Sequence, residues 1–176
     1  MSSKILVIYK SKTGYTKKYA EFISEELSCD TKENRKLTLN DLSPYDTIIY
    51  GGGLYAGSIN GLSFIKNNFE SLKNKKLILF AVGSAPSKEK DLQKVWESNL
   101  TEAQREVIHT FYCRGGLDFS KLSLGNRFIM TIMKKILQRK KNPDEGTLEM
   151  LETFDKPSDY TDKKNIIPIV KLVKEG

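Results

Sequence analysis

A short run of hydroxyl-bearing residues and glycine follows the first apolar segment of the chain. The apolar segment is Ile5-Leu6-Val7-Ile8-Tyr9, and a helix-like pattern follows the loop Ser11-Lys12-Thr13-Gly14-Tyr15-Thr16. The first turn of a helix has backbone N–H groups without intrahelical acceptors and carries a partial positive charge, so it binds anions. The loop therefore indicates a phosphate site. An ordinary polar strand-to-helix turn is the alternative for so short a motif.

Each residue of this loop has an expected part in binding. The hydroxyls of Ser11, Thr13 and Thr16 would donate hydrogen bonds to phosphate oxygens, and Gly14 would let the backbone close around the group. Lys12 adds positive charge, or else stays solvated. The residues that we assign to cofactor binding here are Ser11, Lys12, Thr13, Gly14, Tyr15 and Thr16.

Two later loops each follow an apolar run and carry small residues. Gly51 to Ser58 combines glycines with one aromatic residue, Tyr55, which we expect to stack on a flat ring. The loop Gly83-Ser84-Ala85-Pro86 is suited to covering the edge of such a ring. A glycine-rich turn with an exposed tyrosine is the alternative for the first, and a plain loop for the second. The assigned residues are Gly52, Gly53, Leu54, Tyr55, Ala56, Gly83, Ser84 and Ala85.

Other chemistries find little support in the sequence. The sequence contains no Walker-type phosphate loop. The pattern Gly-x-Gly-x-x-Ala at Gly51 to Ala56 is the alternative signal for a dinucleotide site. It lies neither after the first strand nor directly before a helix, which disfavours that site. No cluster of His, Cys, Asp or Glu has the spacing of metal ligands, and no Ser/His/Asp or Cys/His set is present. His109, the single histidine, is expected to be structural. We assign no catalytic side chain.

Size and composition favour one domain spanning residues 1–176. No apolar run reaches the roughly 20 residues that a bilayer span needs, and the first residues lack the layout of a signal peptide. The two cysteines, Cys29 and Cys113, indicate no disulfide framework. These features predict a cytoplasmic protein.

The positive charge is concentrated in one segment. The chain has a formal net charge of +7, and the segment 121–141 holds seven basic residues and no acidic one. Removing these seven from the 29 basic residues leaves 22, which equals the number of acidic residues. The helix predicted over 124–139 has an apolar face wider than a helix on a sheet usually buries. We expect 124–141 to contact the inner face of a membrane, a quinone or a partner, or else to be an ordinary amphipathic helix. Nucleic-acid binding is not expected.

Strand-like and helix-like runs alternate along the chain, which predicts an α/β fold with a parallel sheet. The strands are predicted over 4–9, 35–39, 46–51, 77–82 and 108–114. The helices are predicted over 14–28, 62–72, 90–99, 124–139 and 162–173, with one more turn starting at Thr101.

The three loops in this order resemble the flavodoxin family over essentially the whole chain. The resemblance implies a three-layer sandwich with a five-stranded parallel sheet in the order 2-1-3-4-5 and FMN held non-covalently by the three loops. Phe111-Tyr112-Cys113-Arg114-Gly115-Gly116-Leu117 and the segment 127–135 are similar to the branch of menaquinone-dependent protoporphyrinogen IX dehydrogenases. That likeness implies two-electron flavin chemistry with a quinone acceptor. The chain departs from the branch in its third loop and in lacking a tryptophan near Tyr160.

The sequence thus predicts an FMN-dependent oxidoreductase whose partner is a quinone or a redox protein. The alternative is a flavodoxin without a substrate of its own, which carries single electrons between proteins. Such carriers usually present acidic surfaces, whereas this chain has a basic segment. A third interpretation is that the protein has this fold but binds no flavin and acts as an interaction module.

Overall fold

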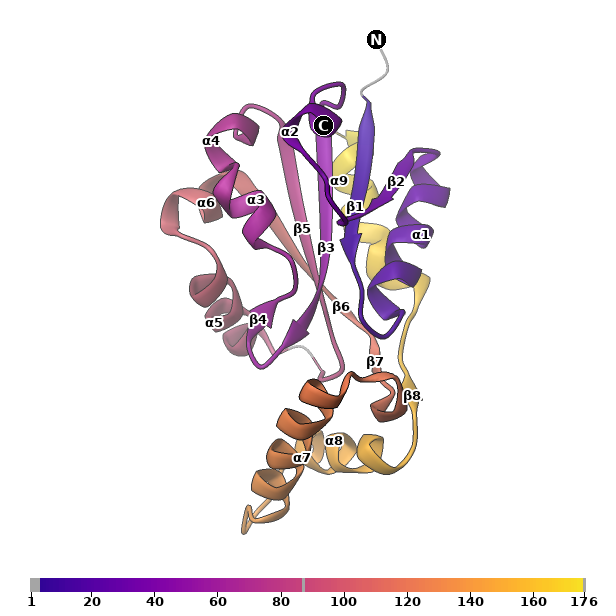
Figure 1. Cartoon of the computed structure of the whole chain (residues 1–176), viewed down its shortest axis with the longest axis vertical. Helices are drawn as coiled ribbons and strands as arrows, with labels where there is room; N and C mark the ends of the chain where they lie inside the picture. The colour runs from indigo at the N-terminus through magenta and orange to yellow at the C-terminus, as the bar shows by residue number, and fades with distance from the viewer. Residues whose placement is uncertain (1–3, 87, 176) are drawn as a thin grey trace.

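The centre of the molecule is a parallel β-sheet (Figure 1). A computed structural model describes residues 4–86 and 88–175 of the chain. Within these residues the sheet contains the parallel strands β1 (Ile5–Lys10), β2 (Asp30–Glu33), β3 (Thr47–Tyr55), β5 (Lys76–Gly83) and β6 (Ile108–Arg114). Their order is β2-β1-β3-β5-β6. The predicted strand order 2-1-3-4-5 is confirmed.

Helices cover both faces of the sheet, so the predicted three-layer sandwich is also confirmed. One face carries α1 (Tyr15–Leu27) and α9 (Ile167–Glu175), which follows the short turn η2 (Lys163–Ile166). The opposite side carries α3 (Ser63–Asn67), α4 (Phe69–Leu72), α5 (Glu89–Asn99) and α6 (Glu102–Val107), as Figure 1 shows. A single turn, α2 (Leu39–Leu42), precedes β3.

Successive side chains of each strand enter different cores. Leu6 and Ile48 belong to the buried cluster on one face, and Val7 and Ile49 to the cluster on the other. A parallel sheet that is buried on both faces requires apolar residues at consecutive positions rather than at alternate ones. This requirement explains the continuous apolar runs by which these strands are recognised in the sequence.

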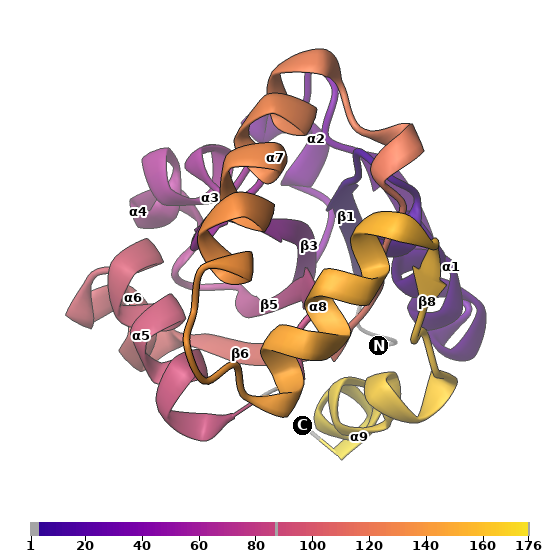
Figure 2. The same cartoon turned by 90° about the horizontal axis from the view of Figure 1, so that it is seen from below.

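A helical arm lies beyond the carboxyl ends of the strands. The arm is defined here as residues 116–159, and it leaves the sandwich after β6 (Figures 1 and 2). Its elements are β7 (Gly116–Leu117), the turn η1 (Phe119–Lys121), α7 (Leu124–Gln138), α8 (Glu145–Asp155) and β8 (Ser158–Asp159). β7 and β8 pair in antiparallel fashion and close the base of the arm. No helix within residues 4–86 and 88–175 has the length and apolar character needed to cross a membrane.

The second strand lies earlier than predicted. We expected it over 35–39, but β2 runs from Asp30 to Glu33 and pairs with β1 from Leu6 to Tyr9. Lys36 has a φ of 56°, in the left-handed region, so an extended strand cannot pass through it. β2 is an edge strand of polar residues, and it lacks the apolar pattern by which buried strands are recognised.

Gly51, Gly52 and Gly53 lie in a strand, not in the loop predicted over 51–58. β3 continues to Tyr55 and pairs with the short strand β4 (Ser58–Ile59) through a turn at Ala56 and Gly57, whose φ values are 48° and 82°. Two positive φ values are typical of a type I′ hairpin. At Gly51 a Cβ would lie 2.0 Å from the Phe80 Cζ atom. Glycine is required at that position by core packing rather than by a bound ring.

Two helical predictions also need correction. The helix predicted over 62–72 is divided at Asn68, whose side-chain Nδ2 donates to the Phe64 carbonyl oxygen at 2.7 Å. An asparagine that bonds to nearby backbone competes with helical hydrogen bonds. Helix α8 was not predicted, although its capping residue is visible in the sequence: the Asp144 carboxylate accepts from the Thr147 amide at 3.0 Å.

Candidate cofactor site

The three predicted loops and the arm enclose one cavity of about 210 Å³. It lies at the carboxyl ends of β1, β3 and β5, where ligands bind in open α/β sheets. The loops contribute Thr13, Tyr15, Thr16, Gly53, Leu54, Tyr55, Ala56, Gly57, Gly83, Ser84 and Ala85. The end of the sheet and the arm contribute Val82, Tyr112, Gly116, Leu117, Leu122, Met130, Met133 and Met150.

The first loop ends in an anion-binding helix terminus. Gly14 precedes α1 with a φ of 98°, a conformation that L side chains rarely adopt. In the described part of the chain, the amides of Tyr15, Thr16 and Lys17 donate to no protein acceptor. The first turn of α1 also contains no acidic residue. The terminus therefore offers free donors and a partial positive charge to an anion.

Ser11 shapes this loop from within. Its Oγ atom accepts a hydrogen bond from the Gly14 amide at 3.0 Å, which closes the turn just before α1. Ser11 and Gly14 do not line the cavity, whereas Thr13 and Thr16 do. The role of the Ser11 hydroxyl as a phosphate donor stays a prediction.

Tyr55 forms one side wall of the cavity. Its ring lies against Gly53, where a Cβ would come within 2.7 Å of a ring carbon. The Lys12 ammonium lies 4.7 Å from the ring centroid, at cation–π distance. Burial raises the pKa of the Tyr55 hydroxyl, and a hydrogen bond with Thr13 lowers it again in part. Lys12 thus packs on this wall without lining the cavity, and stacking of Tyr55 on a flavin ring stays a prediction.

The third loop is fixed by two side chains of β6. The Tyr112 hydroxyl donates to the Ala85 carbonyl oxygen at 2.6 Å, and Arg114 Nε donates to the Ser84 carbonyl oxygen at 3.2 Å. Gly83 lies against Tyr112, whose hydroxyl oxygen would be 2.7 Å from a Cβ. The structure therefore places Gly83, Ser84 and Ala85 at the cavity, and their contact with a cofactor stays a prediction. Gly52 packs instead against Ile59 and Asn60 and does not line it.

The arm supplies an apolar wall that the site assignments missed. The wall contains Leu117 and Leu122 from the base of the arm, Met130 and Met133 from α7, and Met150 from α8. Methionine is flexible and polarisable, so such a wall adapts to flat apolar molecules. The excess apolar width of the predicted helix over 124–139 was the one sequence feature that pointed to it. Part of that width faces the cavity.

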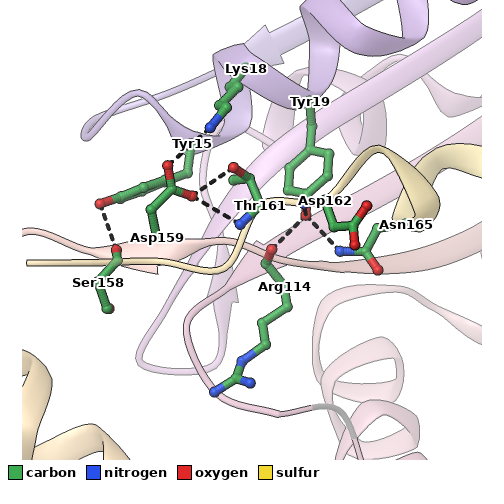
Figure 3. Close-up of polar contacts among 9 residues, drawn as sticks. All are labelled: Tyr15, Lys18, Tyr19, Arg114, Ser158, Asp159, Thr161, Asp162 and Asn165. Atoms are coloured by element: carbon green, nitrogen blue, oxygen red, sulfur yellow. Dashed lines mark hydrogen bonds and ion pairs between the residues drawn. The ribbon is translucent and has the colours of Figure 1, made fainter.

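A network of hydrogen bonds ties the returning end of the arm to α1 (Figure 3). The buried Tyr19 hydroxyl donates to the Arg114 carbonyl oxygen at 2.5 Å and accepts from the Asp162 amide at 3.2 Å and from Asn165 Nδ2 at 2.7 Å. Tyr15 donates to the Ser158 carbonyl oxygen at 2.8 Å. The Tyr15 bond holds the base of the arm beside the N-terminal end of α1, and the Tyr19 bonds fix the segments on either side of the arm.

Arg114 connects the third loop to the arm. Its guanidinium forms an ion pair with Glu149 of α8 at 2.6 Å and stacks 3.8 Å from the centroid of the Tyr160 ring. Arg114 also donates to Ser84, so one side chain contacts the loop, α8 and the segment after β8. The position of α8 over the cavity is thereby coupled to the third loop.

The cysteines give the site no thiol chemistry. Cys113 is fully buried, and burial raises its pKa to about 12; burial and the nearby Asp30 raise the pKa of Cys29 to about 11. Because the thiolate is the reactive form, we expect native protein at pH 8 to react with Ellman's reagent at least about ten-fold more slowly than unfolded protein. Equal rates would contradict this assignment. Among the described residues, no group of three or more His, Cys, Asp or Glu side chains could hold a metal ion.

Comparisons with known proteins show which proteins the chain resembles. It is 29% identical over 113 residues to uncharacterized protein MJ0298 of Methanocaldococcus jannaschii, covering 64% of this chain and 75% of that protein. It is 27% identical over 168 residues to the flavodoxin-like domain-containing protein BilS of Clostridioides difficile, covering 87% of this chain and 94% of BilS.

The two-electron reduced flavodoxin of Megasphaera elsdenii aligns with a TM-score of 0.45 and 21% identity, covering 61% of this chain and 84% of that flavodoxin. The family described as flavodoxin domain matches residues 6–144, well over half of the sequence. The chain therefore belongs to the flavodoxin domain family.

Proposed function

We propose that this chain binds FMN non-covalently and transfers electron pairs through the flavin to a quinone, as a protoporphyrinogen-dehydrogenase-type oxidoreductase. One observation carries the proposal: a single cavity has an anion-binding end at α1 and a methionine-rich wall from the arm. Membership of the flavodoxin domain family supports FMN as the cofactor.

The residues at the first loop fit a phosphate monoester. The free amides of the first turn of α1 provide hydrogen-bond donors, the hydroxyls of Thr13 and Thr16 can rotate to donate as well, and no carboxylate of that turn competes. Charge-assisted hydrogen bonds from such groups are each worth about 1.5–3 kcal/mol. Thr13, Thr16 and the first turn of α1 would therefore hold the phosphate of FMN.

The rest of the cavity fits a flat ring system. Leu54, Tyr55 and Ala56 line one part and Ser84 and Ala85 another, so small and aromatic side chains surround the space. Bound FMN supplies the redox chemistry, because the isoalloxazine ring accepts and releases either one or two electrons. The chain binds and orients the ring, while the third loop, fixed by Tyr112, covers part of the cavity.

The arm supports an enzyme rather than a simple electron carrier. Met130, Met133 and Met150 provide an apolar surface beside the ring position, where water would be displaced and an apolar acceptor could lie. A carrier that passes single electrons to proteins needs an exposed ring edge. The cavity wall thus favours a small apolar acceptor such as a quinone.

The test begins with the absorbance spectrum of purified protein after addition of FMN and desalting. A retained flavin spectrum supports the cofactor, and a colourless protein contradicts the proposal. Anaerobic titration with a reductant then separates the two functions. Reduction in a single two-electron step, with turnover of a soluble menaquinone analogue, supports the enzyme. Two resolved one-electron steps without quinone turnover support the carrier.

A pair of variants on α8 tests the methionine wall. Met150 lines the cavity, whereas Leu148 on the same helix is exposed and does not. We expect Met150→Gln to lower kcat/KM for the quinone analogue by about ten-fold, since a polar group in an apolar pocket costs that much or more. Leu148→Gln should leave kcat/KM unchanged. If the two variants, measured at the same FMN occupancy, lower kcat/KM equally, the acceptor does not bind at this wall.

A further inference from the structure

The outer face of α7 carries large apolar side chains that no other part of the described structure covers. Five of them are more than two-fifths exposed. At 100° per residue they fall within an arc of about 140° on the helix. We call them the apolar stripe: Leu124 (83% exposed), Phe128 (69%), Ile129 (52%), Ile132 (44%) and Ile136 (60%).

The stripe is separate from the cavity wall. Met130 and Met133 of the same helix face the cavity, on the side away from the stripe. Figure 2, viewed from the end of the molecule at which the arm lies, shows α7 at the front with no helix or strand across it. A contiguous exposed apolar surface of this kind marks an interaction site.

Cations that form no ion pair accompany the stripe. Within the segment 121–141, Lys121 and Lys134 form ion pairs with Asp118 and Asp155, and Arg127 donates to backbone carbonyls of η1. The remaining cations form no ion pair with any residue that the structure describes; they are Lys135, Arg139, Lys140 and Lys141. Lys140 donates one hydrogen bond, to the uncharged Thr147 hydroxyl at 3.5 Å, so its charge stays uncompensated. By helical position, Lys135 and Arg139 fall within the arc of the stripe.

We propose that the outer face of α7 docks on an anionic lipid surface, with the apolar stripe in the interface and the four cations beside the headgroups. An interfacial helix buries its apolar face about 5–10 Å into the boundary between headgroups and acyl chains, and long basic side chains reach back to the phosphates. α7 has 15 residues, so it extends for about 22 Å along such a surface.

Charge favours lipid over a second copy of the chain. A copy presents the same face, and its segment 121–141 has no carboxylate to pair with these four cations. An anionic bilayer offers negative charge at every position along the helix, and each nearby Lys or Arg adds attraction. The proposal goes beyond the redox function and does not depend on it, because docking needs neither FMN nor a substrate.

The test is sedimentation with sucrose-loaded vesicles of phosphatidylcholine, with and without about 30 mol% phosphatidylglycerol. We expect binding to the anionic vesicles to be at least about ten-fold tighter than to the neutral ones and to weaken as salt is raised. Binding should be the same with and without FMN. Absence of binding to anionic vesicles, or equal binding to both, overturns the proposal.

Two matched pairs of variants locate the surface. Ile136→Ser removes part of the stripe, and Ile167→Ser makes the same change at an equally exposed site on α9; only the first should weaken binding, by about ten-fold. The double variant Lys135→Gln with Arg139→Gln should weaken it by about 30-fold. Lys90→Gln with Lys94→Gln on α5 has the same spacing and charge change and should have little effect.

Other occupants of the face would overturn the proposal in recognisable ways. All of these substitutions are at exposed positions, so unchanged circular dichroism is expected for each variant. If each control weakens binding as much as its partner on α7, binding to vesicles comes from net charge or nonspecific hydrophobic adsorption rather than from this helix. If light scattering shows a dimer that Ile136→Ser dissociates, and vesicles are not bound, a second copy is the occupant.

Discussion

Thr16→Asp is expected to weaken FMN binding by at least about 100-fold while the protein stays folded. Thr16 lies in the first turn of α1, where amides without acceptors face the proposed phosphate site. A carboxylate there occupies those amides and repels the phosphate, and the loss of charge-assisted hydrogen bonds alone is worth about 3 kcal/mol. Thr16 is only 3% exposed, so the new carboxylate loses hydration. The free amides of the first turn and the helix dipole, which is worth about 0.3–1 kcal/mol, offset that cost.

Two controls accompany this variant. Thr16→Ser keeps the hydroxyl and should bind FMN within a few-fold of the wild type. Ser63→Asp adds the same charge at the first turn of α3, outside the cavity, and should leave the affinity unchanged. The affinity is measured by quenching of FMN fluorescence, and the fold by circular dichroism. If Thr16→Asp retains normal affinity, the phosphate lies elsewhere.

Tyr19→Phe is expected to lower the free energy of unfolding by about 2–4 kcal/mol. The change removes one hydroxyl that has three partners, namely the Arg114 carbonyl, the Asp162 amide and the Asn165 side chain. Tyr19 is fully buried, so water does not readily replace the lost bonds. For a chain of this size, the thermal midpoint should fall by roughly 5–15 °C.

Tyr45→Phe is the matched control for this prediction. It removes the same hydroxyl from a site where the single partner, Asp30 at 2.6 Å, is accessible to solvent. Its effect should stay below about 1 kcal/mol. Chemical denaturation of both variants, with the same slope of free energy against denaturant, gives the comparison. Equal losses would mean that the Tyr19 network contributes no more than one exposed hydrogen bond.

The strands that could be predicted from the sequence are those buried on both faces. The run from Leu77 to Val82 has apolar residues at every position because its two faces contact two different cores. β2 escaped prediction because it is a short polar edge strand whose place is set by pairing with β1. Pairing of this kind is a property of the folded sheet and leaves no pattern in four polar residues.

The first loop and the apolar wall of the cavity also differ in how far the sequence predicts them. The loop from Ser11 to Thr16 is recognisable because its residues are adjacent in the chain and directly precede or begin a helix, a local arrangement that favours anions. The methionine wall joins Met130 with Met150, which are distant in sequence and meet only through the packing of α7 and α8. The sequence shows the capping residue of α8, Asp144, but it does not show that α8 packs against α7.

The base of the arm has a consequence for how such a protein can diversify. The chain enters the arm after Gly115 and returns at Tyr160, and the Tyr160 amide donates to the Gly115 carbonyl oxygen at 2.9 Å. Entry and exit thus share one joint, so insertions and deletions within the arm need not move β6 or α9. Substitutions can therefore change the apolar wall of the cavity while the three loops at the ends of β1, β3 and β5 keep their positions. The joint thus makes the length and composition of the arm independent of the geometry of the sheet.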